Sequence, residues 1–360
     1  MRVLIICNRF WPPEVKRRGI GSVFQLVREI SKRKIEVHVL TALEKIADKD
    51  IFLWFKEENQ KYKIVFHVID LRWFPFSGPI HHGLSKFVYL CVAVKLHLKF
   101  KFDIINEFSE SPLFFLPNLV YKSLGAKTVH TICTTSVWNF LSVPLIWRIG
   151  HFLDKVVVTS SWVEKKLLAA GFSKEKLTYF SFGVNLKKFK PTKKENDKVR
   201  VVYVGKEDIK RGLDLFFEAA KKINGPEFIW VASAANSSPP KINLIKGIKN
   251  IAKIFTEVEV VVLPYKNLEG ILFEPQTLLE AMASGLAVLI PNFPILREIA
   301  DDSVLYYKPK SRRDFLRKLR KLVEDRNLRV MLGKKARKIV EERFDVNDSV
   351  RKLIRVYEGN

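Results

Sequence analysis

The chain has 360 residues, enough for two domains of ordinary size, and 48% of them are hydrophobic, enough for a core in each. Charged residues of both signs make up 28%, a composition that argues against a disordered chain. The net charge of +25 predicts a partner that carries anionic groups, such as a nucleotide, a nucleic acid or an anionic membrane.

The first half of the chain alternates predicted strands with predicted helices. Residues 2–7, RVLIIC, form an apolar run typical of a strand buried on both faces, and a helix pattern follows at 22–33. With the next strand at 36–41, this is a βαβ unit. Further strands are predicted at 63–69, 102–108, 126–133, 155–160 and 176–184.

A second alternation follows a polar stretch, 185–198, which is the best candidate for a linker. Strands are predicted at 199–205, 227–233, 258–264 and 287–291, and helices at 212–223 and 275–285. We therefore expect an α/β fold with two Rossmann-like parallel-sheet domains that face a central cleft, where ligands bind at the carboxyl ends of the strands. We place the domains at 1–190 and 191–340, and a C-terminal helix with one apolar docking face at 341–360.

The loop RFWPPEVKRRGIGS (9–22) leads from a buried strand into a helix. Gly19 and Gly21 would let backbone amides approach an anion at the start of that helix. The alternative is an ordinary βα loop. The spacing is not GxGxxG, so it does not predict a dinucleotide site.

Two cations follow the first strand of the second half, in VGKEDIKRG (204–212). Lys206 and Arg211 lie between the end of a strand and the start of a helix, where they could clamp a diphosphate. The alternative is a basic turn exposed to solvent, because this chain contains 63 Lys and Arg residues.

Two carboxylates flank a helix start in FEPQTLLEAMASG (273–285). Glu274 lies just before Pro275, and Glu280 lies about one and a half turns into the helix. A carboxylate at Glu280 could accept hydrogen bonds from both hydroxyls of a ribose. Alternatively, both acids offset the helix dipole or pair with lysines.

His130 lies in an apolar strand, either as a core residue or as a contact to a ligand that enters over the strand end. His81, His82 and His151 have no partners at ligand spacing, so we expect no metal site. The short motif DKD at 48–50 is interpreted as a solvated turn.

Together these segments resemble the retaining glycosyltransferases of family 4, which have two Rossmann-like domains in the GT-B fold. The resemblance covers nearly the whole chain. Its carriers are FWPPEVKRRGIGSVFQLVREISKRKIEVHVLT (10–41), VTSSWVEKKLLAAGFSKEKLTYFSFGVNLKKFKP (158–191), VVYVGKEDIKRGLDLFFEAAKKI (201–223) and LLEAMASGLAVLIPNFPILREI (278–299).

The resemblance implies a hexosyltransferase that moves a sugar from a nucleotide diphosphate sugar to a hydroxyl acceptor, with retention and without a metal or other cofactor. It implies that the second domain holds the nucleotide, with Lys206 and Arg211 on the diphosphate and Glu280 on the ribose. It also implies that Gly19 and Gly21 line the acceptor side and touch the phosphates. His130 matches a family position that contacts the transferred sugar.

The chain departs from the family pattern around the first acid of the family's Glu pair, whose register falls on Leu272. Either Glu274 replaces that acid after a two-residue shortening and acts with His130 in catalysis, or the acid is missing. The Gly-Gly of the first loop is replaced by Arg17 and Arg18. In one alignment a family histidine falls on Cys133.

The resemblance leaves other functions open, namely a nucleotide-sugar epimerase on the same scaffold or a basic nucleic-acid-binding protein. We do not expect a nucleic-acid partner, because the basic runs lack interleaved aromatic residues. The acceptor could be a sugar or a lipid-linked group, with 51–55, 71–76 and 86–102 forming apolar surface beside lysines at an anionic membrane. The alternative is that these segments are core helices.

We expect a cytoplasmic location, peripheral on the membrane at most. Cys7, Cys91 and Cys133 are far apart among apolar residues, as expected of reduced thiols. The N-terminal apolar run is too short for a signal peptide, and Lys95 and Lys99 interrupt the most apolar long window. Abundant Lys, Arg and Glu beside three Gln match the composition of thermophile proteins.

Overall fold

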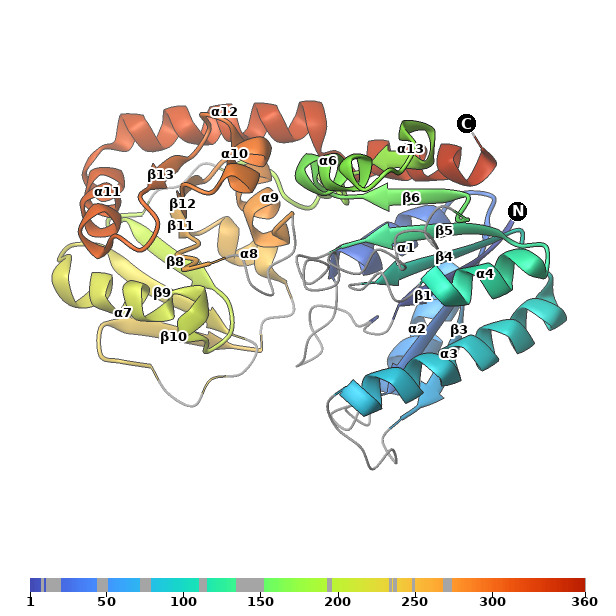
Figure 1. The fold of residues 1–360 in the computed structure, drawn as a ribbon. Coiled ribbons are helices and arrows are strands. Elements are labelled where there is room, and N and C mark those ends of the chain that lie inside the picture. Colours follow the sequence, from blue (N-terminus) through green and yellow to red (C-terminus); the bar gives the residue numbers. More distant parts are fainter. Residues whose placement is uncertain are drawn as a thin grey trace. The chain divides into compact units, whose positions relative to one another are not determined.

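The computed structural model describes residues 1–7, 10, 21–43, 51–71, 79–109, 115–133, 152–192, 196–232, 235, 238–247, 250–267 and 274–359. The chain divides into two compact units. The first is Met1–Ser181 with Ser349–Asn360, and the second is Phe182–Asp348. Each unit has a parallel sheet flanked by helices, as the two-domain α/β prediction requires (Figure 1).

The sheet of the first unit has seven parallel strands in the order β3-β2-β1-β4-β5-β6-β7. They are β1 Arg2–Cys7, β2 Glu36–Leu43, β3 Ile64–Asp70, β4 Ile104–Ser109, β5 Lys127–Ile132, β6 Lys155–Val158 and β7 Leu177–Tyr179. All of the predicted strands are present. The last ends five residues earlier than predicted: Phe180 still donates to the Val158 carbonyl of β6, but Val184 donates to the Phe344 carbonyl of the second unit.

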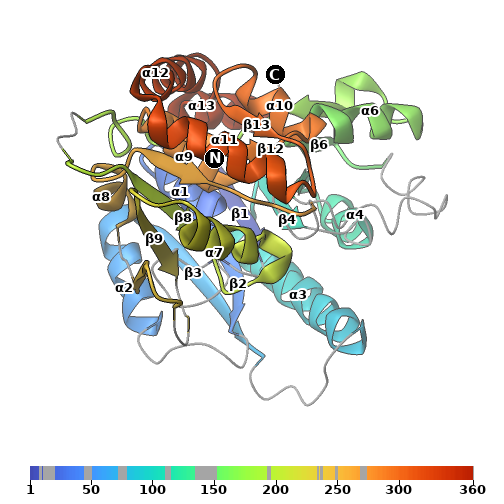
Figure 2. The ribbon, with the colours of Figure 1, turned by 90° about the vertical axis from the view of Figure 1, so that its left-hand side faces the viewer.

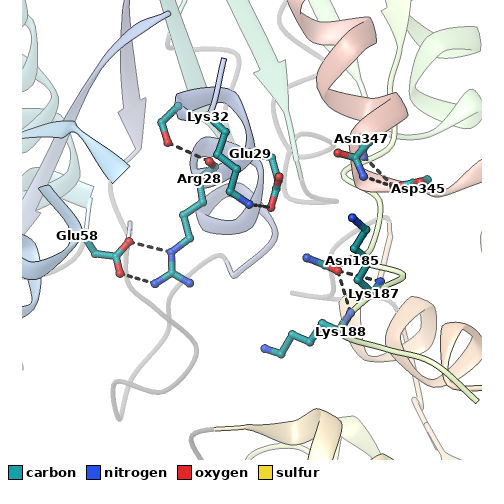
Figure 3. Close-up of polar contacts among 10 residues, drawn as sticks. Arg28, Glu29, Lys32, Glu58, Asn185, Lys187, Lys188, Asp345 and Asn347 are labelled. Carbon is teal, nitrogen blue, oxygen red and sulfur yellow. Dashed lines mark hydrogen bonds and ion pairs between the residues drawn. The ribbon is translucent and has the colours of Figure 1, made fainter. Parts of the chain in front are cut away.

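The first unit contains α1 Gly21–Ser31, α2 Ile51–Tyr62, α3 Pro79–Phe100, α4 Phe115–Ser123, α6 Ser161–Ala169 and a 3-10 turn, Lys174–Lys176. An ion pair joins α1 to α2: Arg28 Nε donates to Glu58 Oε2 at 2.8 Å, and a second guanidinium nitrogen contacts Glu58 Oε1 (Figure 3). The guanidinium also lies 4.0 Å from the centroid of the Phe24 ring. This bidentate, stacked arrangement fixes the two helices against each other.

Helices α3 and α4 pack on the face of the sheet that presents Leu4 and Ile6 (Figure 2). Tyr89 of α3 and Tyr121 of α4 are buried in that core. The inner face of α3 is therefore a core face, as the alternative interpretation of 86–102 required.

The second unit has six parallel strands in the order β10-β9-β8-β11-β12-β13. They are β8 Arg200–Val204, β9 Glu227–Ala232, β10 Ile242–Lys246, β11 Val260–Val262, β12 Ala287–Pro291 and β13 Leu305–Tyr307. The two edge strands, β10 and β13, were not predicted from the sequence. Edge strands are only partly buried, so neither shows the continuous apolar run of a central strand.

The helices of the second unit are a 3-10 turn Ile209–Arg211, α7 Leu213–Lys222, α8 Ile251–Phe255, α9 Gln276–Ala283, α10 Pro294–Ala300, α11 Arg312–Glu324 and α12 Arg326–Arg343. The polar stretch 185–198 begins as part of this unit rather than as an open linker. Asn185 Oδ1 accepts from the amides of Lys187 and Lys188 at 3.0 and 2.9 Å (Figure 3). Val184 and Phe189 are buried in the core of the unit. The division at 181/182 thus precedes the expected one at 190.

The final helix is α13, Val346–Glu358, and its residues from Ser349 onward belong to the first unit. Asn106 Nδ2 of β4 donates to the buried Tyr357 hydroxyl at 2.8 Å. Lys127 Nζ donates to the carbonyls of Val356 and Tyr357 at 3.1 and 3.0 Å, which places a cation at the C-terminal end of the helix dipole. The helix starts later than 341 because 341–343 are the last turn of α12.

Candidate functional site

The turn after β8 places Lys206 at the carboxyl edge of the second sheet. The Gly205 amide donates to the Val231 carbonyl at 3.0 Å, and Trp230 Nε1 donates to the Gly205 carbonyl at 3.0 Å. These bonds hold the turn against β9. The Lys206 side chain is exposed, as an anion site requires.

Arg211 lies at the same edge, at the end of the 3-10 turn. Its backbone amide donates to the Asp208 carbonyl at 3.1 Å, and its Nε lies 3.7 Å from Asp208 Oδ2. Burial raises the pKa of Tyr265 to about 12, and the positive charge of Arg211 opposes that rise. Arg211 is therefore close to the end of β11 as well as β8, and about a third of its side chain is exposed.

A third cation at this edge was not singled out from the sequence. Lys266 follows β11, and its Nζ is 2.7 Å from Asp214 Oδ2 in the first turn of α7. The sequence signal would have been a lysine just after a predicted strand. Lys266 already has this carboxylate partner within its own unit.

Glu280 lies on the outward face of α9. Five of the helix's eight residues are buried: Leu278, Leu279, Ala281, Met282 and Ala283. Gln276, Thr277 and Glu280 are half-buried and, at spacings of three and four residues, share one face. In a parallel α/β sheet the helix before a strand starts at the carboxyl edge, so the first turn of α9 lies at the same edge as Lys206 and Arg211.

Glu274 has a different environment, since its side chain is 2% exposed. Its Oε1 accepts from the Gly183 amide at 3.2 Å, while Gln276 Nε2 donates to the Gly183 carbonyl at 3.2 Å. The Glu274 and Gln276 side chains thus form hydrogen bonds with both the N–H and the C=O group of Gly183. This contact joins residues 91 positions apart and was not predicted from the sequence.

His130 lies in β5, third from its end, and is 1% exposed. Its Nδ1 is 3.4 Å from Nδ2 of Asn118, a residue of α4. Asn118 Nδ2 also donates to Glu107 Oε2 of β4 at 3.4 Å. Glu107 and His130 are paired in the register of the two strands. Glu107 and Asn118 were not candidates in the sequence analysis, and the available signal was a glutamate inside an apolar strand.

This buried group is electrically neutral at neutral pH. Burial and, to a lesser extent, the positive charge of Lys86 lower the pKa of His130 to about 3. Burial raises the pKa of Glu107 to about 8, against the charge of Lys86 and the hydrogen bond from Asn118. Because an amide nitrogen can only donate, Nδ1 of His130 is the acceptor and its Nε2 carries the proton.

Of the remaining candidates, Gly21 is the first residue of α1. Gly19, the motif at 48–50 and His151 lie outside the described residues. Within the described ranges, no group of three His, Cys, Asp or Glu side chains is placed to hold a metal ion. In the same part of the chain, no helix combines the length and apolarity needed to cross a bilayer.

The structure thus brings Lys206, Arg211 and Glu280 to one edge of the second sheet, while Gly21 and His130 belong to the first unit. The residues of the second unit can bind an anion next to a hydroxyl-bearing ring, because Lys206, Arg211 and a helix start supply positive charge and Glu280 supplies an acceptor.

Two family models match adjacent parts of the chain. The model described as Glycosyltransferase Family 4 matches residues 21–188, and the model described as Glycosyl transferases group 1 matches residues 184–339. A curated relative, the sulfoquinovosyl transferase SQD2 of Arabidopsis thaliana, is 26% identical over 281 residues. That match covers 68% of this chain, but the chain spans only 54% of the relative's length.

Solved structures share the fold over their whole length. Sucrose-phosphate synthase from Thermosynechococcus elongatus has a TM-score of 0.78 at 17% identity, covering 99% of this chain and 98% of that one. HepE of Anabaena, solved in complex with UDP-glucose, has a TM-score of 0.72 at 13% identity, with both chains covered completely. These likenesses confirm the expected GT-B fold.

Proposed function

Because the chain belongs to the glycosyltransferases of family 4, we propose that it transfers a sugar from a nucleotide diphosphate sugar to a hydroxyl acceptor, with retention of configuration and without a metal ion. What supports this proposal is the topology of the second unit, which puts Lys206, Arg211 and the start of α9, the helix of Glu280, at one edge of its sheet. A UDP-sugar is the first donor to test, because UDP-glucose is bound in the HepE structure.

Lys206 and Arg211 act on the diphosphate. When the bond between the anomeric carbon and the phosphate oxygen breaks, its electron pair stays on the leaving diphosphate. Two positioned cations stabilise the charge that develops there, which is the role a divalent ion would otherwise fill. The turn at Gly205 and the backbone bond of Arg211 to Asp208 hold the backbone of both cationic residues in place.

Glu280 binds the ribose. A half-buried carboxylate on the outward face of α9 accepts hydrogen bonds from two adjacent hydroxyls, whereas an amide oxygen accepts them more weakly. Glu280 therefore selects a ribonucleoside diphosphate over its deoxy counterpart.

The acceptor hydroxyl attacks the anomeric carbon on the face that the diphosphate leaves, and its proton passes to the leaving phosphate oxygen. This step retains configuration and needs no side-chain base. His130 stays the candidate for the transferred sugar on the family resemblance alone, and its pKa of about 3, lowered by burial, makes it a neutral donor through Nε2 at neutral pH. Glu274 is the acidic candidate on the donor side, in addition to its bond to Gly183.

We further propose that the acceptor is presented at the cytoplasmic face of an anionic membrane, as a lipid-linked hydroxyl. A net charge of +25 supports this location, because such a field concentrates the protein at negatively charged surfaces.

The proposal is tested by thermal-shift titration with UDP, GDP and their sugars, followed by a transfer assay with the best donor. We expect one nucleoside diphosphate to stabilise the protein by about 2.7 kcal/mol at a hundred times its Kd. Lys206→Ala should lower the affinity for that ligand roughly tenfold or more, because it removes a charge-assisted contact. Lys222→Ala is the matched control, an exposed lysine paired with Glu218 in the last turn of α7.

Glu280→Gln is tested with the diphosphate and its 2′-deoxy form. The wild type should prefer the ribose form, and the variant should bind both alike. Failure of every nucleoside diphosphate to stabilise the protein would overturn the proposal. Tight, salt-sensitive binding of oligonucleotides in their place would favour the nucleic-acid alternative.

A further inference from the structure

The outer face of α3 is apolar and cationic at once. Its exposed residues in the part with described side chains are Phe87, Cys91, Lys95, Leu98 and Lys99. Phe87 is 64% exposed and Leu98 is 52% exposed. Their spacings of three and four residues place them in one stripe along the helix. We call these five residues the outer stripe.

A stripe of this kind costs free energy in water, because large apolar side chains are exposed. The opposite side of α3 is occupied, since Tyr89 and Ala93 pack in the core. The helix therefore does not need Phe87 or Leu98 for its own packing.

The charge of α3 has one sign. Residues 79–100 contain no Asp or Glu, and the described structure shows no ion pair that joins Lys95 or Lys99 to an acid. Val120 of the neighbouring helix α4 and Leu124, one residue past its end, are 38% and 39% exposed. The buried His97 of α3 contacts the Leu124 carbonyl at 3.1 Å, so the C-terminal end of α3 lies beside the end of α4 (Figure 1).

A second exposed apolar pair shows what is particular to this stripe. Val330 and Met331 of α12 are 48% and 46% exposed, close to the values on α3. Their helix, however, contains Glu341 and Glu342, which form ion pairs with Arg337 and Lys338. α12 is net positive as well, with seven Lys and Arg residues against these two Glu, so α3 differs from it in having no acidic residue and in exposing an aromatic side chain.

We propose that the outer stripe of α3 docks the protein on an anionic lipid bilayer. A helix that lies in the interface inserts apolar side chains among the acyl chains and keeps its cations among the phosphates. Phe87 and Leu98 are about 16 Å apart along the helix axis, and Lys95 and Lys99 lie within and beyond that span. A protein partner with an acidic apolar groove would satisfy the same residues, but a bilayer also matches the net charge of the whole chain.

Binding through two apolar side chains and a few lysines is reversible and sensitive to salt. Each lysine near an anionic surface contributes roughly fivefold to the partition coefficient at moderate ionic strength. The contribution falls as the Debye length shortens. The protein would therefore bind and leave the membrane between encounters with acceptors.

The test is co-sedimentation of the full chain with vesicles of phosphatidylcholine alone and of phosphatidylcholine with phosphatidylglycerol. The wild type should bind the anionic vesicles and lose most of that binding in high salt. Phe87→Ser with Leu98→Ser should reduce the partition coefficient about tenfold, and Lys95→Glu with Lys99→Glu should abolish binding. Val330→Ser with Met331→Ser is the matched control and should bind like the wild type.

Circular dichroism melts of each variant show whether it is folded, and vesicle binding is read without any sugar transfer. The result is therefore independent of the proposed transferase activity. Equal binding to neutral and anionic vesicles, or equal loss in the α12 control, would overturn the proposal. So would a dimer in analytical ultracentrifugation that the Phe87→Ser, Leu98→Ser variant dissociates, because a second copy would then be the occupant of the stripe.

Discussion

Glu107 and His130 lie opposite each other on β4 and β5, and one amide nitrogen, Nδ2 of Asn118, is 3.4 Å from Oε2 of the first and Nδ1 of the second. Burial favours the uncharged form of both groups, raising the pKa of Glu107 to about 8 and lowering the pKa of His130 to about 3. Asn118 then fixes the orientation of a neutral acid and a neutral imidazole.

The pair should make unfolding depend on pH in two separate windows. Glu107 has an ordinary pKa of 4.5, so between pH 4.5 and about 8 the folded state holds a proton that the unfolded state has lost, and stability falls as pH rises. His130 has an ordinary pKa of 6.5, so stability falls as pH drops from 6.5 to about 3. The two slopes cancel between 4.5 and 6.5, and the pair favours that range.

Glu107→Gln should therefore flatten the decline in the free energy of unfolding between pH 6.5 and 8, and gain on the order of 4 kcal/mol at most over the wild type at the alkaline end. Urea unfolding at each pH is the measurement. Glu175→Gln, at an exposed glutamate, is the control and should follow the wild-type profile. An unchanged alkaline slope in the Glu107 variant would show that Glu107 ionises normally in the folded state.

The bond between Glu274 and Gly183 separates a structural role from a chemical one. Glu274→Ala removes the acceptor of a backbone amide and should cost about 1.5–3 kcal/mol in the free energy of unfolding. Glu274→Gln keeps an acceptor oxygen at the same place and should retain most of the stability. If the Gln variant also retains transferase activity, Glu274 only positions Gly183. If the Gln variant keeps its stability but loses transferase activity, the negative charge of Glu274 acts on the donor.

Gly212 should tolerate no side chain. It has a φ of +80°, and a Cβ there would lie 1.7 Å from the Pro264 carbonyl oxygen, next to Arg211. Gly212→Ala should destabilise the protein by more than about 3 kcal/mol or prevent folding, because both the backbone and its neighbour must move. Gly225→Ala is the matched control, since Gly225 has a φ of +106° but no atom within 4 Å of the added carbon. Thermal unfolding of the control should show only a cost of about 1 kcal/mol.

The hydroxyl of Tyr357 should anchor the end of α13. Tyr357→Phe leaves the buried Asn106 Nδ2 without this acceptor, which should cost about 1–3 kcal/mol and increase proteolytic cleavage near the C-terminus. The double variant Asn106→Leu, Tyr357→Phe tests the cause. Because both polar partners are then gone, it should be more stable than the sum of the single effects indicates. Strict additivity would mean that the bond contributes nothing to the docking of the helix.

Much of the fold followed from the sequence alone. Central strands such as β1 and β8 are continuous apolar runs, and the helices between them carry apolar residues at helical spacing, because both faces of a parallel sheet must be covered. Lys206 and Arg211 could be placed at the carboxyl edge for the same reason, since they directly follow a strand.

Only the tertiary structure decided which distant residues meet. Glu107, Asn118 and His130 come from a strand, a helix and another strand, and the bond of Glu274 to Gly183 links positions 91 residues apart. Local propensity and periodicity carry no record of such pairs, because strand register and helix docking bring them together and only folding sets these. Burial, which shifts the pKa values of Glu107 and His130, likewise belongs to the packed core and not to the residues themselves.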